Sequence, residues 1–471
     1  MISPSIHPEP IRAACERRRR GAFGLTRRSI ALLLFGFVWL IPGFWDGRLA
    51  YAMLAWDGLA LMAAALDGLR LPSAAQLTAG RTWSNAPALD SETEIELTIE
   101  NRGQTIVECR LLDDLPPALV AEPATHRLTA FPRVPARLRY RVEPMERGDW
   151  ETGWLYVRYR SGLGLVERWG KAPLTQSVRI YPALRAGEEQ QIFLARSRQI
   201  DLQLRKAQHR GLGRDFESLR EYREGDDLRD ICWTATARRG GLITRQYQSE
   251  RSQPVWIALD CGRLMRARVA AAPASKNSGP APSSHSKLDH ACSTAVALAQ
   301  LALYSGDRVG LLAYGQEIQQ RILPGRGAAH LRQLIESLAQ LRAESSEADH
   351  LRATAALNRL QPRRSLILWV TDLAETAMRP EVIDGAAQLL RRHVLLFVAM
   401  AQPEVESIAQ ARPKDAEGMF LAAAAQEMAG RREVLLARLR EQGALTLDLN
   451  PEALTSSVLN QYLKVKERAL V

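Results

Sequence analysis

The feature that most constrains this chain is an uncharged apolar run at residues 29–45, SIALLLFGFVWLIPGFW, which directly follows an arginine-rich segment. The run is just long enough to cross a bilayer, because a spanning helix needs about 17–25 residues. A second apolar stretch extends from about Leu49 to Leu69 and is interrupted by Asp57 and Asp67. Together the two stretches predict a transmembrane helical hairpin over residues 29–71.

The charges around the hairpin predict its orientation. Residues 1–28 form a basic N-terminus that we expect in the cytoplasm by the positive-inside rule, and two crossings then return the main body to the same side. The predicted location is therefore the bacterial cytoplasmic (inner) membrane, multi-pass, with the body cytoplasmic. The basic run 17–20 can also attract anionic head groups of the lipid bilayer, at about 1 kcal/mol per basic residue.

Two alternatives to the hairpin remain open on the sequence alone. A cleaved signal peptide would need a small-residue cleavage site, and none follows Trp45. The second stretch can instead lie shallowly at the interface, with Asp57 at its water-facing edge, since an ionisable group inside a span is costly. The body is cytoplasmic only if the second stretch crosses.

Composition excludes several protein classes. The chain has 471 residues, of which 46% are hydrophobic, and a formal net charge of +11. This excludes a wholly disordered or collagen-like protein and suits two to four domains. The 5 cysteines form no CxxC pair, which excludes a zinc ribbon or a thioredoxin motif and fits a reducing compartment.

Period-two alternation begins after the hairpin. Ile95, Leu97 and Ile99 alternate with polar residues, and residues 138–142 and 154–159 repeat the strand pattern. Short strands separated by turn residues predict a small β-sandwich-like domain over residues 78–185. It carries no catalytic constellation, so we expect a structural or docking role.

The last part of the chain, residues 253–471, alternates buried strands with amphipathic helices. The strand runs are 255–260, 365–372 and 394–400, and this pattern predicts an open α/β domain with a parallel sheet. Asp260 and Asp372 sit where strands end, so we expect them to face one another across the crevice in which such sheets bind ligands. An Ala/Pro/Ser-rich insertion, 267–286, contains Lys276 and is followed by Lys287 at the same edge.

A dense motif precedes this domain. Residues 211–239 read GLGRDFESLREYREGDDLRDICWTATARR, and Gly-x-Gly, Phe-Glu-x-Leu-Arg-x-Tyr, Gly-Asp-Asp, Arg-x-Ile and Trp-x-x-x-Ala-Arg occur in order. The segment, residues 200–252, resembles the DUF58 family. The resemblance implies a membrane-anchored protein with a von Willebrand factor A-like domain, from a family often encoded beside MoxR-type AAA+ ATPases. It also implies an adaptor or assembly role with that ATPase as partner.

The A-domain resemblance nominates a metal site, normally Asp-x-Ser-x-Ser with a Thr and an Asp from two later loops. Here the first motif reads DCGRL from Asp260 to Leu264, so both serines are missing, while Asp372 matches the third-loop acid. The second-loop Thr has no clear match, and the nearest polar residues are Ser345, Ser346 and Asp349. Asp260 and Asp372 can hold Mg²⁺ weakly, or the site is vestigial and Arg263 replaces the cation by pairing with one of them. No other cofactor is expected.

The DUF58 motif offers arginine, acidic and aromatic side chains that suit a binding face. We predict partner binding for Arg214, Asp215, Phe216, Arg220, Tyr222, Asp226, Asp227, Arg229, Trp233 and Arg238. Arginine forks pair with carboxylates and anchor interfaces, so the segment is either a clamp between the two domains or a docking face. Acids interleave with the bases, which argues against a nucleic-acid partner.

No nucleotide-binding loop or hydrolase motif occurs, and the leading hypothesis is a non-enzymatic adaptor or assembly protein. The alternatives are a metal-dependent enzyme at the cytoplasmic face and an envelope-assembly scaffold.

Overall fold

The computed structural model describes residues 8–17, 23–39, 49–121, 123–183, 192–197, 199, 215–223, 228, 231–248, 253–269, 285–373, 380–401, 403–413 and 415–468. The chain divides into two compact units, Met1–Ala183 and Leu184–Val471, which are called unit 1 and unit 2 below. Each unit has its own buried core, as expected for a chain of this length.

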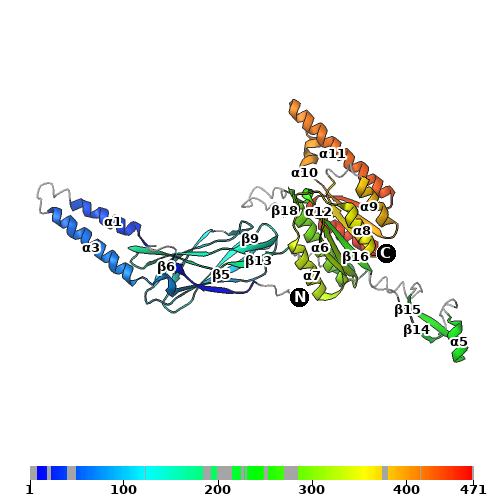
Figure 1. The fold of residues 1–471 in the computed structure, drawn as a ribbon, viewed down its shortest axis with the longest axis horizontal. Coiled ribbons are helices and arrows are strands. Elements are labelled where there is room, and N and C mark those ends of the chain that lie inside the picture. The colour runs from blue at the N-terminus through cyan, green and yellow to red at the C-terminus, as the bar shows by residue number, and fades with distance from the viewer. Residues whose placement is uncertain are drawn as a thin grey trace. The chain divides into compact units, whose positions relative to one another are not determined.

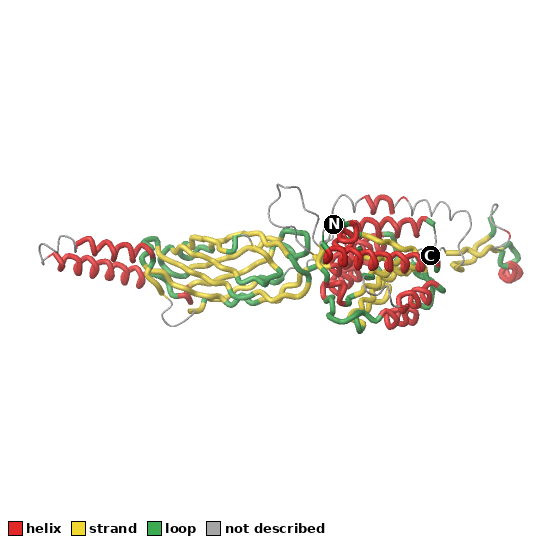
Figure 2. The backbone as a smooth tube through the Cα atoms, turned by 90° about the horizontal axis from the view of Figure 1, so that it is seen from above, coloured by secondary structure: helices red, strands yellow, loops and turns green. Residues whose placement is uncertain are grey.

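Unit 1 begins its helical part with a pair of helices that lie side by side (Figures 1 and 2). These are α1 (Arg27–Gly36), continued by the 3-10 turn η1 (Phe37–Trp39), and α3 (Leu49–Arg70). Within the described residues one helix is long and apolar enough to cross a membrane, over Tyr51–Arg70. The described part of α1 has 10 residues, and residues 40–48, on which the predicted hairpin also depends, lie outside the described residues.

Close packing holds the two helices together. The indole nitrogen of Trp56 donates to the Leu32 carbonyl oxygen at 2.8 Å, and the rings of Phe35 and Trp56 lie 5.6 Å apart. Gly36 packs against the Asp57 carboxylate so closely that a Cβ at this position would overlap it. Asp57 therefore faces α1, and its Oδ1 atom is buried without a described hydrogen-bond partner.

The rest of unit 1 is a β-sandwich, which confirms the strand pattern expected from the alternation. Its sheets run in the orders β1-β4-β5-β9-β7 and β2-β12-β11-β6-β8, with β3 beside β12, and β10 pairs with β13. The elements are β1 (Ile11–Ala14), β2 (Glu16–Arg17), β3 (Phe23–Leu25), η2 (Ala74–Gln76), β4 (Leu77–Trp83), β5 (Thr93–Asn101), β6 (Val107–Asp113), β7 (Leu119–Ala121), β8 (Thr125–Ala130), β9 (Ala136–Pro144), β10 (Gly148–Thr152), β11 (Leu155–Ser161), β12 (Val166–Ala172) and β13 (Gln176–Ile180). The segment 1–28, expected only as a basic N-terminus, thus also contributes strands.

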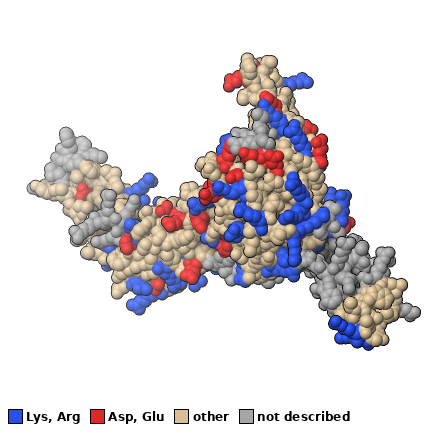
Figure 3. All heavy atoms as spheres, turned by 45° about the vertical axis from the view of Figure 1, so that its right-hand side comes forward, with Lys and Arg blue, Asp and Glu red and all other residues tan. Residues whose placement is uncertain are grey.

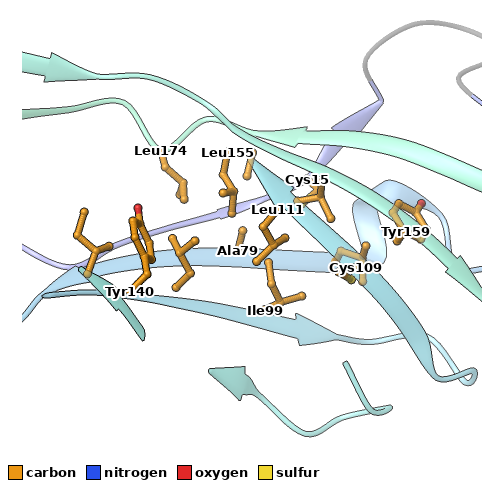
Figure 4. Close-up of a cluster of buried hydrophobic side chains, with 14 of the residues drawn as sticks. Cys15, Ala79, Ile99, Cys109, Leu111, Tyr140, Leu155, Tyr159 and Leu174 are labelled. Carbon is orange, nitrogen blue, oxygen red and sulfur yellow. The ribbon is translucent and has the colours of Figure 1, made fainter. Parts of the chain in front are cut away.

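The sandwich core forms because alternate residues of each strand point inward. Inward side chains such as Ile99, Leu111 and Leu155 fill the space between the sheets (Figure 4). The same core contains Cys15 and Cys109, and burial raises the pKa of each thiol to about 12. Both are buried free thiols, which makes them inert at neutral pH.

One loop, residues 161–166, joins the helices to the sandwich. The Asp67 carboxylate near the end of α3 accepts hydrogen bonds from the Ser161 hydroxyl at 2.5 Å and from the amides of Leu165 at 3.0 Å and Val166 at 3.2 Å. The Ser29 hydroxyl on α1 donates to the Leu165 carbonyl oxygen. Asp67 is 2% exposed, so this acid in the second apolar stretch is a buried structural anchor.

Unit 2 contains an open α/β sheet, as the sequence predicted, in the order β20-β19-β16-β21-β22-β23. All neighbouring pairs are parallel except β19 with β20. The strands are β16 (Pro254–Asp260), β19 (Arg308–Tyr314), β20 (Ile318–Gly325), β21 (Leu366–Thr371), β22 (Val394–Met400) and β23 (Leu445–Leu449), with the short pair β17 (Arg268–Val269) and β18 (His285–Ser286). The helices are η4 (Arg263–Arg266), α6 (Lys287–Tyr304), α7 (Gly327–Gln340), α8 (His350–Leu360), α9 (Pro380–Leu390), α10 (Pro403–Gln410), α11 (Ala416–Glu441) and α12 (Pro451–Glu467).

The motif that carries the family resemblance forms a small element group. Strands β14 (Asp215–Glu221) and β15 (Ile243–Gln248) pair antiparallel, and α5 (Trp233–Arg239) lies between them in sequence (Figure 1). Helix α5 ends at Gly240, whose φ of +71° suits a left-handed C-terminal cap that glycine adopts without strain. The buried side chains Ile231, Cys232 and Ile243 pack this group.

Candidate functional site: a buried ion pair at the sheet switch point

The site lies where the order of the sheet reverses. The chain passes from β16 to β19 on one side and later adds β21 on the other side of β16. Leu259 pairs with Val370 across this boundary, so Asp260, the last residue of β16, and Asp372, which directly follows β21, lie at the same carboxyl edge. The structure thus brings together the two acids that the sequence placed at strand ends. Such switch points are where open α/β sheets bind ligands.

Asp372 is fully buried, and its charge is balanced by a lysine. The ammonium nitrogen of Lys287 lies 2.5 Å from Asp372 Oδ2, and both side chains are at most 1% exposed. A guanidinium nitrogen of Arg432 lies 3.8 Å from Asp372 Oδ1, and Arg432 also pairs with Asp448 at 2.5 Å. The site is therefore a chain of alternating charges drawn from α6, the residue that follows β21, α11 and β23.

Lys287 is held in an unusual place for a cation. It is the first residue of α6, where the helix dipole disfavours positive charge. A capping box fixes this helix start, because the Ser286 hydroxyl and amide both bond to the Asp289 carboxylate, at 2.6 and 3.0 Å. The ion pair with Asp372 stabilises the charged lysine at this helix start, so the lysine and the aspartate depend on each other.

Asp260 uses its hydrogen-bonding capacity inside the protein. Oδ1 accepts from the Gly262 amide at 2.7 Å, and Oδ2 accepts from the Thr371 hydroxyl at 2.6 Å. Burial raises the pKa of Asp260, and the negative charge of Asp372 adds to this rise. The charge of His350 and the two hydrogen bonds act in the opposite direction and lower the pKa. A carboxyl that has a raised pKa and is only 4% exposed is a poor ligand for an incoming group.

A hydrogen-bonded network of aromatic side chains packs beside the site. The Tyr314 hydroxyl accepts from the Trp369 indole nitrogen at 2.6 Å and lies 3.0 Å from His350 Nδ1. Burial, and then the charge of Asp260, raises the pKa of Tyr314 well above its usual value, so the phenol stays neutral. These side chains fix the carboxyl ends of β19 and β21 and add packing rather than reactive groups.

The cation in this site is not the one suggested by the sequence. Arg263 pairs with Glu347 at 3.2 Å, at a part-exposed position, and not with Asp260 or Asp372. The reason is geometric: Arg263 follows Gly262 out of the sheet edge, and its backbone amide bonds to the Ser346 carbonyl oxygen at 2.9 Å. The expected pairing of Arg263 with a strand-end acid is therefore wrong, and Lys287 takes that role.

The polar residues nearest to the expected second loop are also engaged elsewhere. Ser345 accepts from Arg266 at 3.2 Å, and the Ser346 hydroxyl donates to Glu344 at 3.1 Å. Asp349 caps α8 by accepting from the Arg352 amide at 2.8 Å. These contacts hold the three side chains with other partners, so they add no ligand oxygen to a metal site at Asp260 and Asp372.

These residues do not fit a divalent cation. Mg²⁺ prefers near-octahedral oxygen ligands, whereas Asp372 already contacts an ammonium and lies near a guanidinium. At an effective dielectric constant of about 20, a divalent ion 4 Å from an ammonium is repelled by roughly 8 kcal/mol. Within the described ranges no cluster of three or more His, Cys, Asp or Glu residues is placed to hold a metal. The weak magnesium site remains a prediction that this geometry does not favour.

A groove opens beside the buried pair. It has a volume of about 310 Å³ and lies between α10, α11 and the end of β23. Arg432 and Asp448 line it, so these two residues connect the buried Lys287–Asp372 pair to the surface of the groove. Figure 3 shows acidic and basic side chains intermixed near the α11 end of unit 2, and basic side chains over the lower part of its visible face.

The structure places only some of the predicted partner-binding residues. Arg214, Asp226, Asp227 and Arg229 lie outside the described residues, and for Asp215 and Phe216 only the backbone, within β14, is described. Arg220 and Tyr222 are half-buried, whereas Arg238 is exposed on α5. Trp233 begins α5 and is 67% exposed. The described members thus present an aromatic and a basic side chain to solvent.

Sequence reasoning placed Lys287 at this edge without pairing it with Asp372, and it missed Arg432. No sequence pattern points to Arg432, because it lies within a long helix and 60 residues after Asp372 in the chain. Lys287 carries a weak signal: Ser-Lys-Leu-Asp is a helix start, and a lysine at the first helical position is unfavourable unless an acid lies nearby.

Comparisons agree with the motif. Residues 218–418 match the family described as "Protein of unknown function DUF58". No curated protein matches the sequence significantly. Among solved structures, the chain is similar to the hypothetical protein BatB of Bacteroides thetaiotaomicron, with 14% identity and a TM-score of 0.29 over 45% of this chain and 98% of that one. A von Willebrand factor type A protein of Catenulispora acidiphila has 10% identity and a TM-score of 0.27 over 48% and 44%. Similarity at this level carries no function across.

Proposed function

Because residues 218–418 of this chain form a DUF58 region, we propose that the protein is a membrane-anchored, non-enzymatic adaptor that works with a MoxR-type AAA+ ATPase. In this proposal α3 and the apolar run that begins in α1 cross the bacterial inner membrane as a hairpin, with the sandwich of unit 1 and the whole of unit 2 on the cytoplasmic side. The apolar helix over Tyr51–Arg70 and the arginines at the start of α1 support this orientation.

The observation that carries the proposal is the exposed tryptophan of the motif segment. Trp233 is 67% exposed and Leu228 is 68% exposed, whereas Trp256 and Trp369 in the sheet are at most 1% exposed. Arg238 and Arg239 lie exposed in the last turn of the same helix. Tryptophan and arginine are the residues that most often anchor protein interfaces. We therefore assign the ATPase to the exposed surface of α5 around Trp233, with Arg238 and Arg239 as further exposed basic groups of the same helix.

The strand-end site supports a role without chemistry. The described hydrogen bonds and ion pairs of Asp260 and Asp372 are made with groups of the same unit. A general acid or base needs a free position toward a substrate, and a metal ligand needs a free lone pair. The metal-dependent alternative consequently draws no support from this donor set.

The test is capture of partners by the full-length protein from detergent-solubilised native membranes at moderate salt. We expect an AAA+ subunit to be retained by the wild type and lost with Trp233→Ala. A matched control is Phe131→Ala, which removes a 50% exposed aromatic ring from the sandwich. Retention by both variants would place docking elsewhere, and absence of any AAA+ subunit from all three samples would refute the adaptor.

We keep a second proposal, an envelope-assembly scaffold, in which the hairpin is the part that acts. Replacing residues 30–63 by an unrelated helical hairpin, with Ser29 and Asp67 kept in place to hold the sandwich, separates the two roles. If the protein still fulfils its role in the cell after the exchange, the scaffold is excluded, because a scaffold acts through contacts of its spans with other membrane proteins.

A further inference from the structure

Three arginines form a row across the outer face of the sandwich. Arg127 on β8 lies directly opposite Arg110 on β6, and Arg110 lies directly opposite Arg158 on β11. Residues opposite each other in antiparallel strands have Cβ atoms about 4.5–5.5 Å apart, and like charges in such pairs are destabilising. A row of three like charges therefore calls for negative charge from elsewhere.

The acids on this face neutralise only part of the row. Glu167 forms a forked pair with Arg158, at 2.8 and 2.5 Å, and Glu108 pairs with the neighbouring Arg160 at 2.9 and 2.7 Å. Arg110 and Arg127 have no acidic partner among the residues that the structure describes. Both side chains are exposed, so their guanidinium groups are available to a ligand.

The row forms the floor of a groove of about 480 Å³. Arg27 and Arg28, the first residues of α1, also line it, together with the cap residue Thr26. Six arginines and two glutamates line the groove, a formal excess of four positive charges. The amino end of α1 adds its positive helix dipole to this excess. A second groove, of about 390 Å³, is lined by the same three arginines of the row.

The groove is fixed to the start of the helical part of unit 1. Thr26 donates from its hydroxyl to the Gly164 carbonyl oxygen at 2.5 Å, and Arg28 donates to the Leu163 carbonyl oxygen at 3.2 Å. The uncharged run begins at Ser29, directly after these residues. In the membrane-anchored arrangement proposed above, on which this inference rests, the groove then lies at the level of the lipid head groups.

We propose that this arginine groove binds the phosphate groups of an anionic phospholipid of the cytoplasmic leaflet. Guanidinium forks match phosphate oxygens in a bidentate geometry, and basic pockets at the cytoplasmic end of spans are where anionic head groups bind. The bound phosphate supplies the negative charge that Arg110 and Arg127 lack. It also ties the sandwich to the membrane surface.

The test uses purified full-length protein in detergent, with cardiolipin as the probe and phosphatidylcholine as the zwitterionic control. Bound lipid is counted by native mass spectrometry across a titration. We expect R110Q/R127Q to bind cardiolipin about tenfold to a hundredfold more weakly than wild type, because two charge-assisted contacts are lost. The matched control R137Q/R139Q removes two exposed arginines from β9 on the other sheet and should bind like the wild type.

A second readout separates binding from structure. In lipid-free detergent at low salt, R110Q/R127Q should melt at or above the wild-type temperature, because the variant removes like charges from the row. A lower melting temperature together with unchanged lipid affinity would mean a merely structural role and would overturn the proposal. Equal lipid affinity of all three proteins would overturn it as well.

The source of the phosphate is tested with inorganic pyrophosphate. If pyrophosphate displaces cardiolipin only at far higher concentration, the lipid assignment stands; displacement at equal concentration would overturn it in favour of a free anion. Failure of the adaptor is distinguishable, because lipid binding is measured without the ATPase. If cell fractionation finds the chain outside the membrane, the lipid assignment fails whatever the outcome of the partner capture.

Discussion

The buried pair of Lys287 and Asp372 gives the sharpest prediction. Lys287→Met keeps much of the side-chain volume but leaves Asp372, which is 0% exposed, without its closest cation. Arg432 at 3.8 Å compensates only in part, because it also pairs with Asp448. Breaking one side of a buried ion pair costs about 3–5 kcal/mol. We expect a loss near the lower end of this range because Arg432 remains.

The double variant Lys287→Met with Asp372→Asn should be closer to the wild type than either single change. Replacing both members of a buried pair by neutral groups is often nearly neutral, since no uncompensated charge remains. The cycle should give a coupling free energy of about 2–3 kcal/mol between the two side chains. This sign distinguishes an ion pair from two independently useful residues.

The assay is native-state hydrogen exchange of the full-length protein, followed by mass spectrometry on peptides that cover β16 and β21. These central strands exchange through opening of unit 2, so their protection reports its stability. A loss of 3–5 kcal/mol accelerates their exchange by between about a hundredfold and a few thousandfold. Peptides from β5 in the sandwich are the internal control and should not change.

Two results would refute the reasoning. One is unchanged protection of β16 and β21 in Lys287→Met, which would mean that the lysine does not sustain the site. The other is a double variant whose loss equals the sum of the single losses, because the two side chains would then act independently.

Three further predictions concern other groups. Calorimetric titration with Mg²⁺ or Mn²⁺ should show no binding that depends on Asp260 and Asp372; heat lost in the double alanine variant would contradict this. Asp67→Ala removes the acceptor of three hydrogen bonds and should destabilise the helix-to-sandwich junction by about 3 kcal/mol, measured as faster exchange of residues 161–166. Burial, and then the charge of Arg392, lowers the pKa of His393 to about 4, so unit 2 should lose stability as the pH falls from about 6.5 toward 4. In His393→Gln this part of the pH dependence should disappear from denaturant midpoints.

The strands that sequence predicted best are those with continuous apolar runs. Residues 394–400 form β22 as expected, and residues 255–260 lie within β16, because a strand buried on both faces of a parallel sheet must be apolar throughout. Strand β20 was not anticipated. It reads IQQRILPG, lies at the sheet edge and is mostly part-exposed, so no period marks it.

The site could be predicted only in part. Strand ends locate Asp260 and Asp372, because topology brings the carboxyl ends of parallel strands to one edge. The choice of cation depends on three-dimensional placement: Lys287 is 85 positions from Asp372 in the chain and follows an insertion of low complexity. Arg263 was the candidate because it lies three positions after Asp260 in sequence, but the loop geometry at Gly262 directs it away.

The junction loop at residues 161–166 has a mechanical consequence. It bonds to α1 through Ser29 and to α3 through Asp67, so both helices are tied to one short segment of the sandwich. Arg168 adds contacts to the carbonyl oxygens of Gly68 and Leu71 at the end of α3. With no free hinge at these contacts, a tilt of the helix pair turns the sandwich with it. In the membrane-anchored arrangement proposed above, the helices and the sandwich would act as a single lever, which would convert a change in bilayer thickness into a movement of the sandwich.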